Sequence, residues 1–196
     1  MKRATKQAVF RKTAALYSAM QEQYGQCAET IGLTCSGCAD NCCTSFFQHH
    51  TYVEWAYLFK GLSMLPEERQ RTILHRAKEY VSQARMVIAQ GGRPKIMCPL
   101  NEAGLCSLYE YRLMICRLHG VPNLLRMPDG TRRDFPGCVR AQAITASRGA
   151  GVALDRTDLY RRLALIEMQL LGSRKGKLPR VNLTLAEMLV SGPPPV

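Results

Sequence analysis

Apolar side chains recur at three- and four-residue steps between residues 5 and 31, which is the period of an amphipathic α-helix. The positions that share this face are Val9, Thr13, Leu16 or Tyr17, Met20, Tyr24, Cys27 and Ile31. Gly32 follows the last of them and suits the left-handed conformation that commonly ends a helix. We therefore predict one long helix over residues 5 to 31. Cys27 is expected to be a buried core thiol, with a ligand role as the alternative.

Two more helices are predicted between residues 51 and 92. Thr51 and Glu54 have the spacing of a capping box, in which each side chain satisfies an exposed amide of the other residue. Pro66 followed by two glutamates is typical of a first helical turn. The apolar positions of this third helix are Ile73, Ala77, Val81, Ala84 and Val87 or Ile88, and the helix would end at Gly91-Gly92. Such a helical pair would leave the cysteine-rich stretch before residue 44 and return Cys98 close to it.

Turn signals alternate with shorter helices in the rest of the chain. Residues 121 to 138 are rich in Pro, Gly and Asp and are predicted to form a loop, whose final Pro-Gly-Cys138 turn would deliver a last ligand. A helix is predicted from Asp155 to Gly172, and Thr184-Leu-Ala-Glu187 is expected to cap a short terminal helix.

These patterns together predict a fold that is mainly α, a small helical domain built around a cysteine-ligated metal site, with long irregular loops. Residues 1–172 would form a single metal-binding domain with its cysteine core at 35–138. Residues 173–196 would be a basic linker, a short helix and a Pro-rich tail.

The 196 residues have an ordinary globular composition and are enough to bury a core without disulfides. The formal net charge of +12 belongs to the two ends of the chain. Residues 1 to 12 hold five Lys or Arg and no acid, residues 140 to 196 hold nine against four, and the middle holds thirteen against eleven. These ends could contact nucleic acid or another acidic partner. Since no basic block alternates with aromatic stacking residues, solvated helix faces are the favoured interpretation.

No stretch is apolar enough to span a bilayer, and the basic N-terminus lacks the apolar run of a signal peptide, so no membrane contact and a cytoplasmic location are expected. Thiols stay reduced in the cytoplasm, and the nine cysteines of this chain form an odd count that fits a closed disulfide framework poorly. Clustered cysteines under these conditions favour metal or redox chemistry.

Four cysteines fall within nine residues in the stretch Cys35-Ser-Gly-Cys38-Ala-Asp-Asn-Cys42-Cys43. A C-x2-C pair lets a tight turn present two sulfurs to one ion, and thiolates bind zinc and iron–sulfur clusters strongly. The predicted metal ligands are Cys35, Cys38, Cys42, Cys43, Cys98, Cys106, Cys116 and Cys138. Eight thiols suffice for two four-thiolate sites, or for one such site with structural thiols around it. The metal would be zinc or iron, and a [4Fe-4S] cluster is included among the candidates.

The second cysteine segment reads Cys98-Pro-Leu-Asn-Glu-Ala-Gly-Leu-Cys106 and continues to Cys116-Arg117. With the first cluster it resembles the YkgJ-like cysteine-cluster family of zinc- or iron-chelating domains, which pair CxxCxxCC with a later CP-x-L...G-x-C-x-x-Y-x-x-R-P...CR segment. The resemblance implies metal binding within a mostly helical domain. This chain has one extra residue before Cys42, and it has Leu113 where the family has proline. Without that proline, Tyr109 to Cys116 could run as one continuous helical turn.

Several side chains near the cysteines have open roles. Cys42 and Cys43 point in divergent directions in most backbone conformations, so we expect two neighbouring sites, or one ligand and one packing role. His119 is a candidate ligand, with a hydrogen bond to a sulfur or carbonyl as the favoured alternative. His49-His50 is expected to be an ordinary loop dipeptide. Arg112 and Arg117 would either offset thiolate charge or form surface salt bridges.

The predicted function is a metal-binding protein in a structural, metal-handling or redox role. One alternative is an iron–sulfur enzyme, because flagellin lysine N-methylases carry a similar cysteine cluster, although this chain shows no separate methyl-donor domain. Another alternative uses the metal as a scaffold and the basic ends as a nucleic-acid contact, which predicts binding that weakens steeply with salt. No P-loop, dinucleotide fingerprint or Ser/His/Asp arrangement is present, and the sequence identifies no catalytic residue.

Overall fold

The computed structural model describes residues 5–35, 42–148 and 152–196. The α-helices of the described part are α1 (Lys6–Ile31), α2 (Tyr52–Leu62), α3 (Glu67–Ala89), α4 (Met114–Leu118), α5 (Val139–Arg148), α6 (Thr157–Leu171) and α7 (Leu185–Ser191). Short 3₁₀ helices are η1 (Cys42–Thr44), η2 (Tyr109–Tyr111) and η3 (Gly172–Arg174). The strands are β1 (Asn101–Glu102), β2 (Leu105–Cys106), β3 (Asn123–Arg126), β4 (Arg132–Phe135) and β5 (Leu154–Asp155). The prediction of a mainly α fold is confirmed for these residues.

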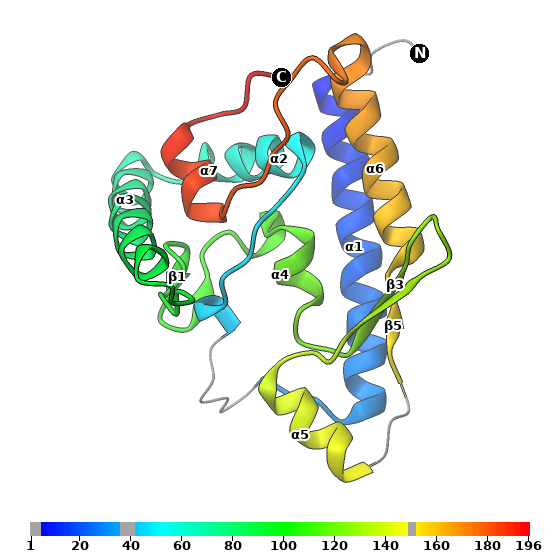
Figure 1. The fold of residues 1–196 in the computed structure, drawn as a ribbon. Helices are drawn as coiled ribbons and strands as arrows, with labels where there is room; N and C mark the ends of the chain where they lie inside the picture. The colour runs from blue at the N-terminus through cyan, green and yellow to red at the C-terminus, as the bar shows by residue number, and fades with distance from the viewer. Residues whose placement is uncertain (1–4, 36–41, 149–151) are drawn as a thin grey trace.

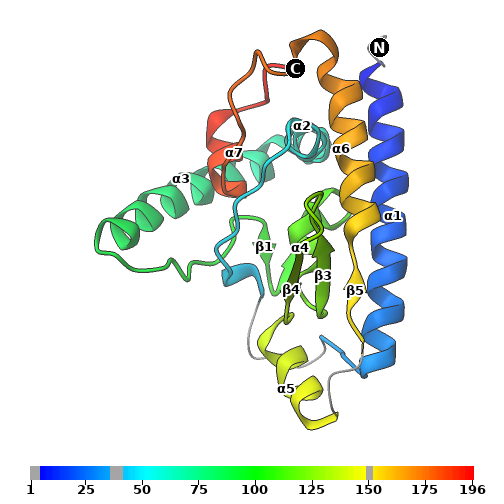
Figure 2. The same cartoon turned by 45° about the vertical axis from the view of Figure 1, so that its right-hand side comes forward.

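The long first helix follows the predicted apolar face. Thr5 caps its start by accepting a hydrogen bond from Ala8 N–H, and Gly32 ends it with φ 72°. Cys27 is only 5% exposed, so its predicted burial is confirmed. The face that α1 buries packs against α6, and the two helices lie side by side along one side of the molecule (Figures 1 and 2).

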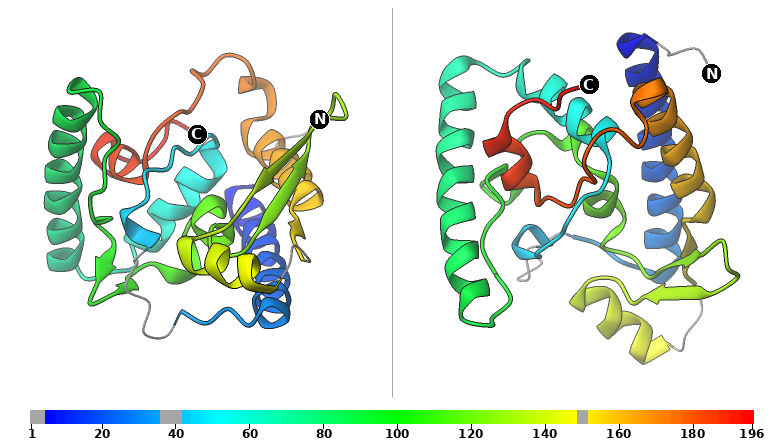
Figure 3. Two further views of the ribbon diagram at one scale, coloured as in Figure 1. Left: turned by 60° about the horizontal axis from the view of Figure 1, so that its bottom comes forward. Right: turned by 45° about the horizontal axis from the view of Figure 1, so that its top comes forward.

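The opposite side of the molecule is made by α3 and α7, which pack against each other (Figure 1). Helices α2 and α4 lie between the two pairs (Figure 3). The C-terminal segment therefore joins the core, since Met188 and Leu189 of α7 are 0% and 1% exposed. Trp55 Nε1 of α2 also donates a 2.9 Å hydrogen bond to Gly192 O beyond α7.

The first residues of α2 and α3 are capped differently from the prediction. Thr51 Oγ1 accepts from Glu54 N–H as a capping box requires, but the Glu54 carboxylate binds other groups and not the Thr51 amide. Instead, Glu167 of α6 accepts the first two N–H groups of α2, with 2.9 Å to Tyr52 N and 2.7 Å to Val53 N. Pro66 is the residue before α3 and not its first helical residue.

The loop predicted over residues 121 to 138 is wrong, because β3 and β4 form an antiparallel hairpin there. Its tip is a Pro-Asp-Gly turn, in which Gly130 has φ 84° and Met127 N–H donates to Thr131 O at 2.8 Å. All four residues of β4 are exposed, so they show none of the alternation that identifies a strand in a sequence. Strand β5 adds to β3 in parallel and gives a three-stranded sheet in the order β4-β3-β5.

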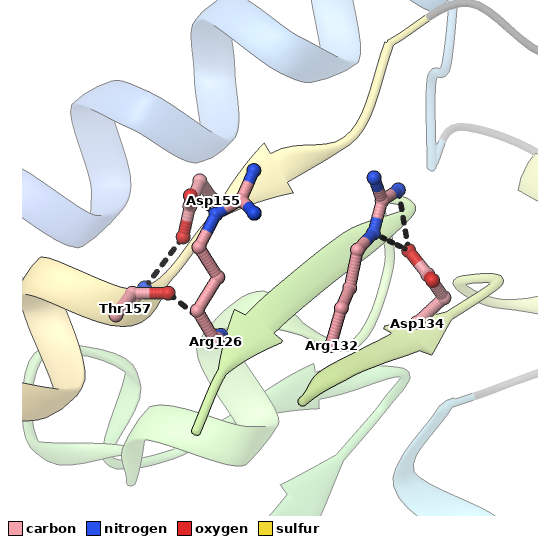
Figure 4. A network of polar contacts seen from close by, with 5 residues as sticks. All are labelled: Arg126, Arg132, Asp134, Asp155 and Thr157. Carbon is pink, nitrogen blue, oxygen red and sulfur yellow. Dashed lines mark hydrogen bonds and ion pairs between the residues drawn. The ribbon is translucent and has the colours of Figure 1, made fainter. Parts of the chain in front are cut away.

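Polar contacts join this sheet to the start of α6 (Figure 4). Thr157 Oγ1 accepts from Arg126 N–H at 2.9 Å, and Asp155 Oδ1 accepts from Thr157 N–H at 3.0 Å. On the outer strand, Arg132 and Asp134 form an exposed ion pair of 2.7 Å. The two contacts of Thr157 tie β3 and β5 to the first residue of the helix that packs on α1.

Helix α5 was not predicted. It starts directly after Cys138, whose carbonyl accepts from Gln142 N–H at 2.9 Å. Of its residues with a described burial, only Ala141 is buried, so the segment lacks the apolar stripe that reveals a helix. In the described residues, no helix has both the length and the apolar character needed to cross a membrane.

Candidate metal centre

Five cysteines line one cavity of about 70 Å³ between η1, the β1–β2 hairpin, α4 and the start of α7. These cavity cysteines are Cys42, Cys43, Cys98, Cys106 and Cys116. They come from two stretches that are far apart in the sequence, Cys42 and Cys43 in the first and Cys98, Cys106 and Cys116 in the second. The cavity is therefore a product of the tertiary fold and not of one local motif.

The two stretches are joined at the cysteines themselves. The N–H of Cys98 donates a 2.9 Å hydrogen bond to the carbonyl oxygen of Cys43. This contact confirms the prediction that the excursion through α2 and α3 returns Cys98 to the first cluster.

A two-residue hairpin positions Cys106. Ala103 and Gly104 both have positive φ, 50° and 87°, as a type I′ turn requires. Strand pairing then places Cys106 opposite Asn101, three residues after Cys98. Ser107 N–H also donates to Leu100 O at 2.8 Å. The turn thus folds the chain back so that two cysteines separated by seven residues reach one cavity.

Cys116 is presented by α4, and the chain in front of it is not a continuous helical turn as predicted. Helix η2 stops at Tyr111, and Arg112 and Leu113 are extended, with ψ values of 142° and 160°. Leu113 is fully buried, and the Arg117 guanidinium donates to the carbonyl oxygens of Arg112, Tyr109 and Glu110. Burial of the leucine and these hydrogen bonds stabilise the break that a proline would otherwise impose.

Glu54 fixes the start of α4 from a distance. Its carboxylate accepts a 2.6 Å hydrogen bond from Met114 N–H, the first helical amide, and others from Tyr17 Oη and Thr51 Oγ1. Leu113, the residue before α4, provides no side-chain cap of its own. Burial raises the pKa of Glu54 above its ordinary value. A buried acid in α2 therefore orients the short helix that carries Cys116.

The thiols of the cavity differ in their electrostatics. Burial raises the pKa of Cys98 to about 12 and raises the pKa of Cys106 and Cys116 as well. The Cys42 thiol donates to the Cys43 sulfur, which lowers the pKa of Cys43 to about 6 and raises the pKa of Cys42. Cys43 is thus the thiol that most readily ionises.

Arg112 is the cationic side chain of the cavity, and its charge favours ionised thiols at Cys43, Cys106 and Cys116. The guanidinium stacks on the Tyr109 ring at 3.9 Å. Arg117 instead is buried against Tyr17 at 4.2 Å and binds backbone carbonyls. The ion pairs found among the described residues involve neither arginine, so the alternative of surface salt bridges is not formed there.

The remaining predicted ligands lie elsewhere. Cys35 and Cys138 both neighbour Tyr24 of α1, and together with burial they raise the pKa of its phenol. Cys138 N–H donates to Gly120 O at 3.2 Å, and a Cβ added at Gly120 would overlap the Tyr24 hydroxyl. We call Cys35 and Cys138 the Tyr24 cysteines. Cys38 lies outside the described residues.

The potential ligand atoms of the described residues around the cavity do not point toward one common metal position. Across residues 5–35, 42–148 and 152–196, no three His, Cys, Asp or Glu side chains form a group that could hold a metal ion. Apart from the buried Cys27, the described cysteines divide into the cavity cysteines and the Tyr24 cysteines, and neither set has ligand geometry.

Two histidines also line the cavity. His119 follows α4, with Nε2 3.5 Å from Ser45 Oγ and its ring edge-on to Phe47 at 4.8 Å. His49, expected to be an ordinary loop residue, is 2% exposed, and burial lowers its pKa to about 3. Its placement depends on pairing with Leu183, so no local sequence pattern could have identified it.

No family model matches the chain, and neither a curated protein nor a solved structure shows a significant similarity to it.

Proposed function

We propose that this protein binds zinc or iron through three or four thiolates among Cys43, Cys98, Cys106 and Cys116, in a structural, metal-handling or redox role. The observation that carries the proposal is the gathering of five cysteine thiols from two distant stretches of the chain around one cavity. Isolated core cysteines pack as small hydrophobes and have no physical reason to meet in this way. Thiolates, by contrast, are the preferred ligands of zinc and of iron–sulfur clusters.

The choice of Cys43 over Cys42 follows from its position. Cys43 O accepts the 2.9 Å hydrogen bond from Cys98 N–H, and Cys43 is less exposed than Cys42. Cys42 then serves as a hydrogen-bond donor to the ligand sulfur, a role that commonly supports metal-bound groups. This assignment agrees with the expectation that two adjacent cysteines take different roles.

The surroundings of the thiols fit a metal ion. The cavity of about 70 Å³ exceeds the roughly 15 Å³ that one water molecule needs. The Arg112 guanidinium would offset part of the negative charge that the thiolates bring. Each cysteine has one χ1 torsion with three staggered wells, and binding a metal would require the sulfurs to turn toward a common point.

A bound metal would also connect the segments around the cavity through its bonds to their cysteines. Neither η1 nor the strands of the β1–β2 hairpin contain a buried residue, so side-chain packing alone ties these segments to the cavity weakly. Zinc bound there would cross-link η1, the β1–β2 hairpin and α4, whereas an iron–sulfur cluster would add one-electron redox chemistry. The chain's own residues orient the thiols in either case.

A pair of matched variants tests this proposal. Cys116→Ser removes a proposed ligand, and Cys27→Ser changes a buried helical thiol outside the cavity. We expect Cys116→Ser to bind zinc at least about tenfold more weakly in a chelator competition, while Cys27→Ser binds as the wild type does. Equal affinities in the two variants would contradict the proposal.

A further inference from the structure

His49 has a buried ring nitrogen without a hydrogen-bond partner among the described residues. The residue lines the same cavity as the cysteines and is 2% exposed. Its Nδ1 has no hydrogen-bond partner among the residues that the structure describes. A buried polar atom without a partner costs roughly 1–3 kcal/mol, so native proteins nearly always provide one.

The backbone holds His49 firmly at the cavity wall. Its N–H donates to Leu183 O at 2.8 Å, and Leu183 N–H donates back to His49 O at 3.2 Å. The next residue, Thr184, forms a capping box with Glu187 and lines the cavity beside Leu185. His49 follows Cys43 by six residues, and its pairing with the C-terminal segment holds it at the cavity wall.

The neighbouring histidines lack this combination of features. His119 Nε2 already has Ser45 Oγ at 3.5 Å. His50 is exposed, does not line the cavity, and has Nδ1 3.3 Å from Val181 O. Of the three, His49 is the histidine with a buried ring nitrogen that no described residue satisfies.

We infer that His49 supplies an imidazole ligand to the metal of the cavity, so that the site is a mixed cysteine and histidine site. This inference rests on the proposed function. Three cysteines and one histidine form a common zinc ligand set. With a divalent ion, three thiolates and a neutral imidazole leave one net negative charge, which matches the single guanidinium of Arg112. Four thiolates would leave two.

X-ray absorption spectroscopy at the zinc edge of the zinc-loaded full-length chain tests this inference. Imidazole ligation gives a nitrogen shell at about 2.0 Å and ring scattering beyond it, next to sulfur at about 2.3 Å. We expect both signatures in the wild type and in the matched controls His50→Gln and His119→Gln. In His49→Gln the imidazole signature should be lost, and zinc affinity should fall at least about tenfold while sulfur ligation persists.

The outcomes separate this inference from the proposed function. An all-sulfur shell in the wild type, or an imidazole signature that survives in His49→Gln, would overturn the histidine assignment and leave thiol ligation standing. Failure of the wild type to bind zinc or iron would overturn both. If circular dichroism shows that His49→Gln does not fold, the X-ray absorption spectra of the wild type and His119→Gln test the histidine assignment in its place. An imidazole signature lost in His119→Gln rules out His49.

Discussion

The N–H of Cys98 and the carbonyl oxygen of Cys43 form a 2.9 Å hydrogen bond that joins the two cysteine segments. Between these residues the chain runs through all of α2 and α3. The helices α2 and α3 thus form a long connection whose two ends, at Cys43 and Cys98, meet in this hydrogen bond. Metal ligation across this junction would add covalent links to a contact that the backbone already makes.

The division between the cavity cysteines and the Tyr24 cysteines predicts different effects for two serine variants. Cys98→Ser removes a thiol of the cavity, whereas Cys138→Ser removes a thiol beside Tyr24. We expect Cys98→Ser to lower the bound zinc per chain or its affinity at least about tenfold. Cys138→Ser should keep the zinc of the cavity. Loss of the same tightly bound zinc in both variants would mean that the cysteines form one site.

Buried Glu54 predicts a pH-dependent difference in stability between the wild type and Glu54→Gln. Because its folded pKa is raised, Glu54 stabilises the fold below its unfolded pKa of about 4.3, and this contribution is lost as pH rises through the folded pKa. The stability of the wild type relative to Glu54→Gln should therefore fall as pH rises from about 4.3. Urea unfolding at several pH values measures it.

A matched control for this measurement is Glu22→Gln, which changes an exposed carboxylate in the middle of α1, away from the helix ends. The fall in relative stability with rising pH should be specific to Glu54→Gln. A constant difference between wild type and Glu54→Gln would show that the buried carboxylate keeps an ordinary pKa.

The hairpin that carries Cys106 has an alanine at a left-handed position. Ala103 has φ 50° and is exposed, and asparagine takes this conformation more easily than alanine. Ala103→Asn should raise the free energy of unfolding by about 0.5–1 kcal/mol, whereas β-branched Ala103→Val should lower it. Thermal unfolding monitored by circular dichroism distinguishes the two, and a stabilising valine would disprove the turn geometry.

Close packing at Gly120 predicts opposite effects for two glycine-to-alanine variants. A Cβ at Gly120 would overlap the Tyr24 hydroxyl, so Gly120→Ala should destabilise the protein by about 1–3 kcal/mol. Gly25 lies in α1 with no atom within 4 Å of an added Cβ, so Gly25→Ala should stabilise it by about 0.5–1 kcal/mol.

Tyr24→Phe provides the second half of this test. Removing the hydroxyl takes away the nearest atom and should recover part of the stability that Gly120→Ala loses. Additive effects of the two changes in urea unfolding would indicate that Tyr24 does not pack over Gly120.

Helical segments with a strong apolar stripe could be predicted from sequence. The face of α1 from Val9 to Ile31 and the glycine that ends it are local features, and so is the Thr184 cap of α7. The β3–β4 hairpin could not be recognised, because β4 is exposed on every residue and carries no alternation. Helix α5 was missed for the related reason that its buried face is small.

The site shows the same limit. The spacing of Cys35 to Cys43 indicates thiol chemistry, but the separation of Cys138 from the cavity depends on Gly120 and Tyr24, which are distant in sequence. His49 reaches the cavity through its pairing with Leu183. A contact between residues so far apart in the sequence leaves no local periodicity, so only the three-dimensional fold reveals it.

Metal and acid-labile sulfide analysis of the anaerobically purified protein, together with its visible spectrum, tests the central proposal most directly. A colourless protein with stoichiometric zinc is the result expected for a single ion held by the cavity cysteines. A brown protein with acid-labile sulfide would support an iron–sulfur cluster in the same cavity. A stably folded protein that contains neither zinc nor iron, and takes up neither when supplied with them, would contradict the proposal that the cavity binds metal.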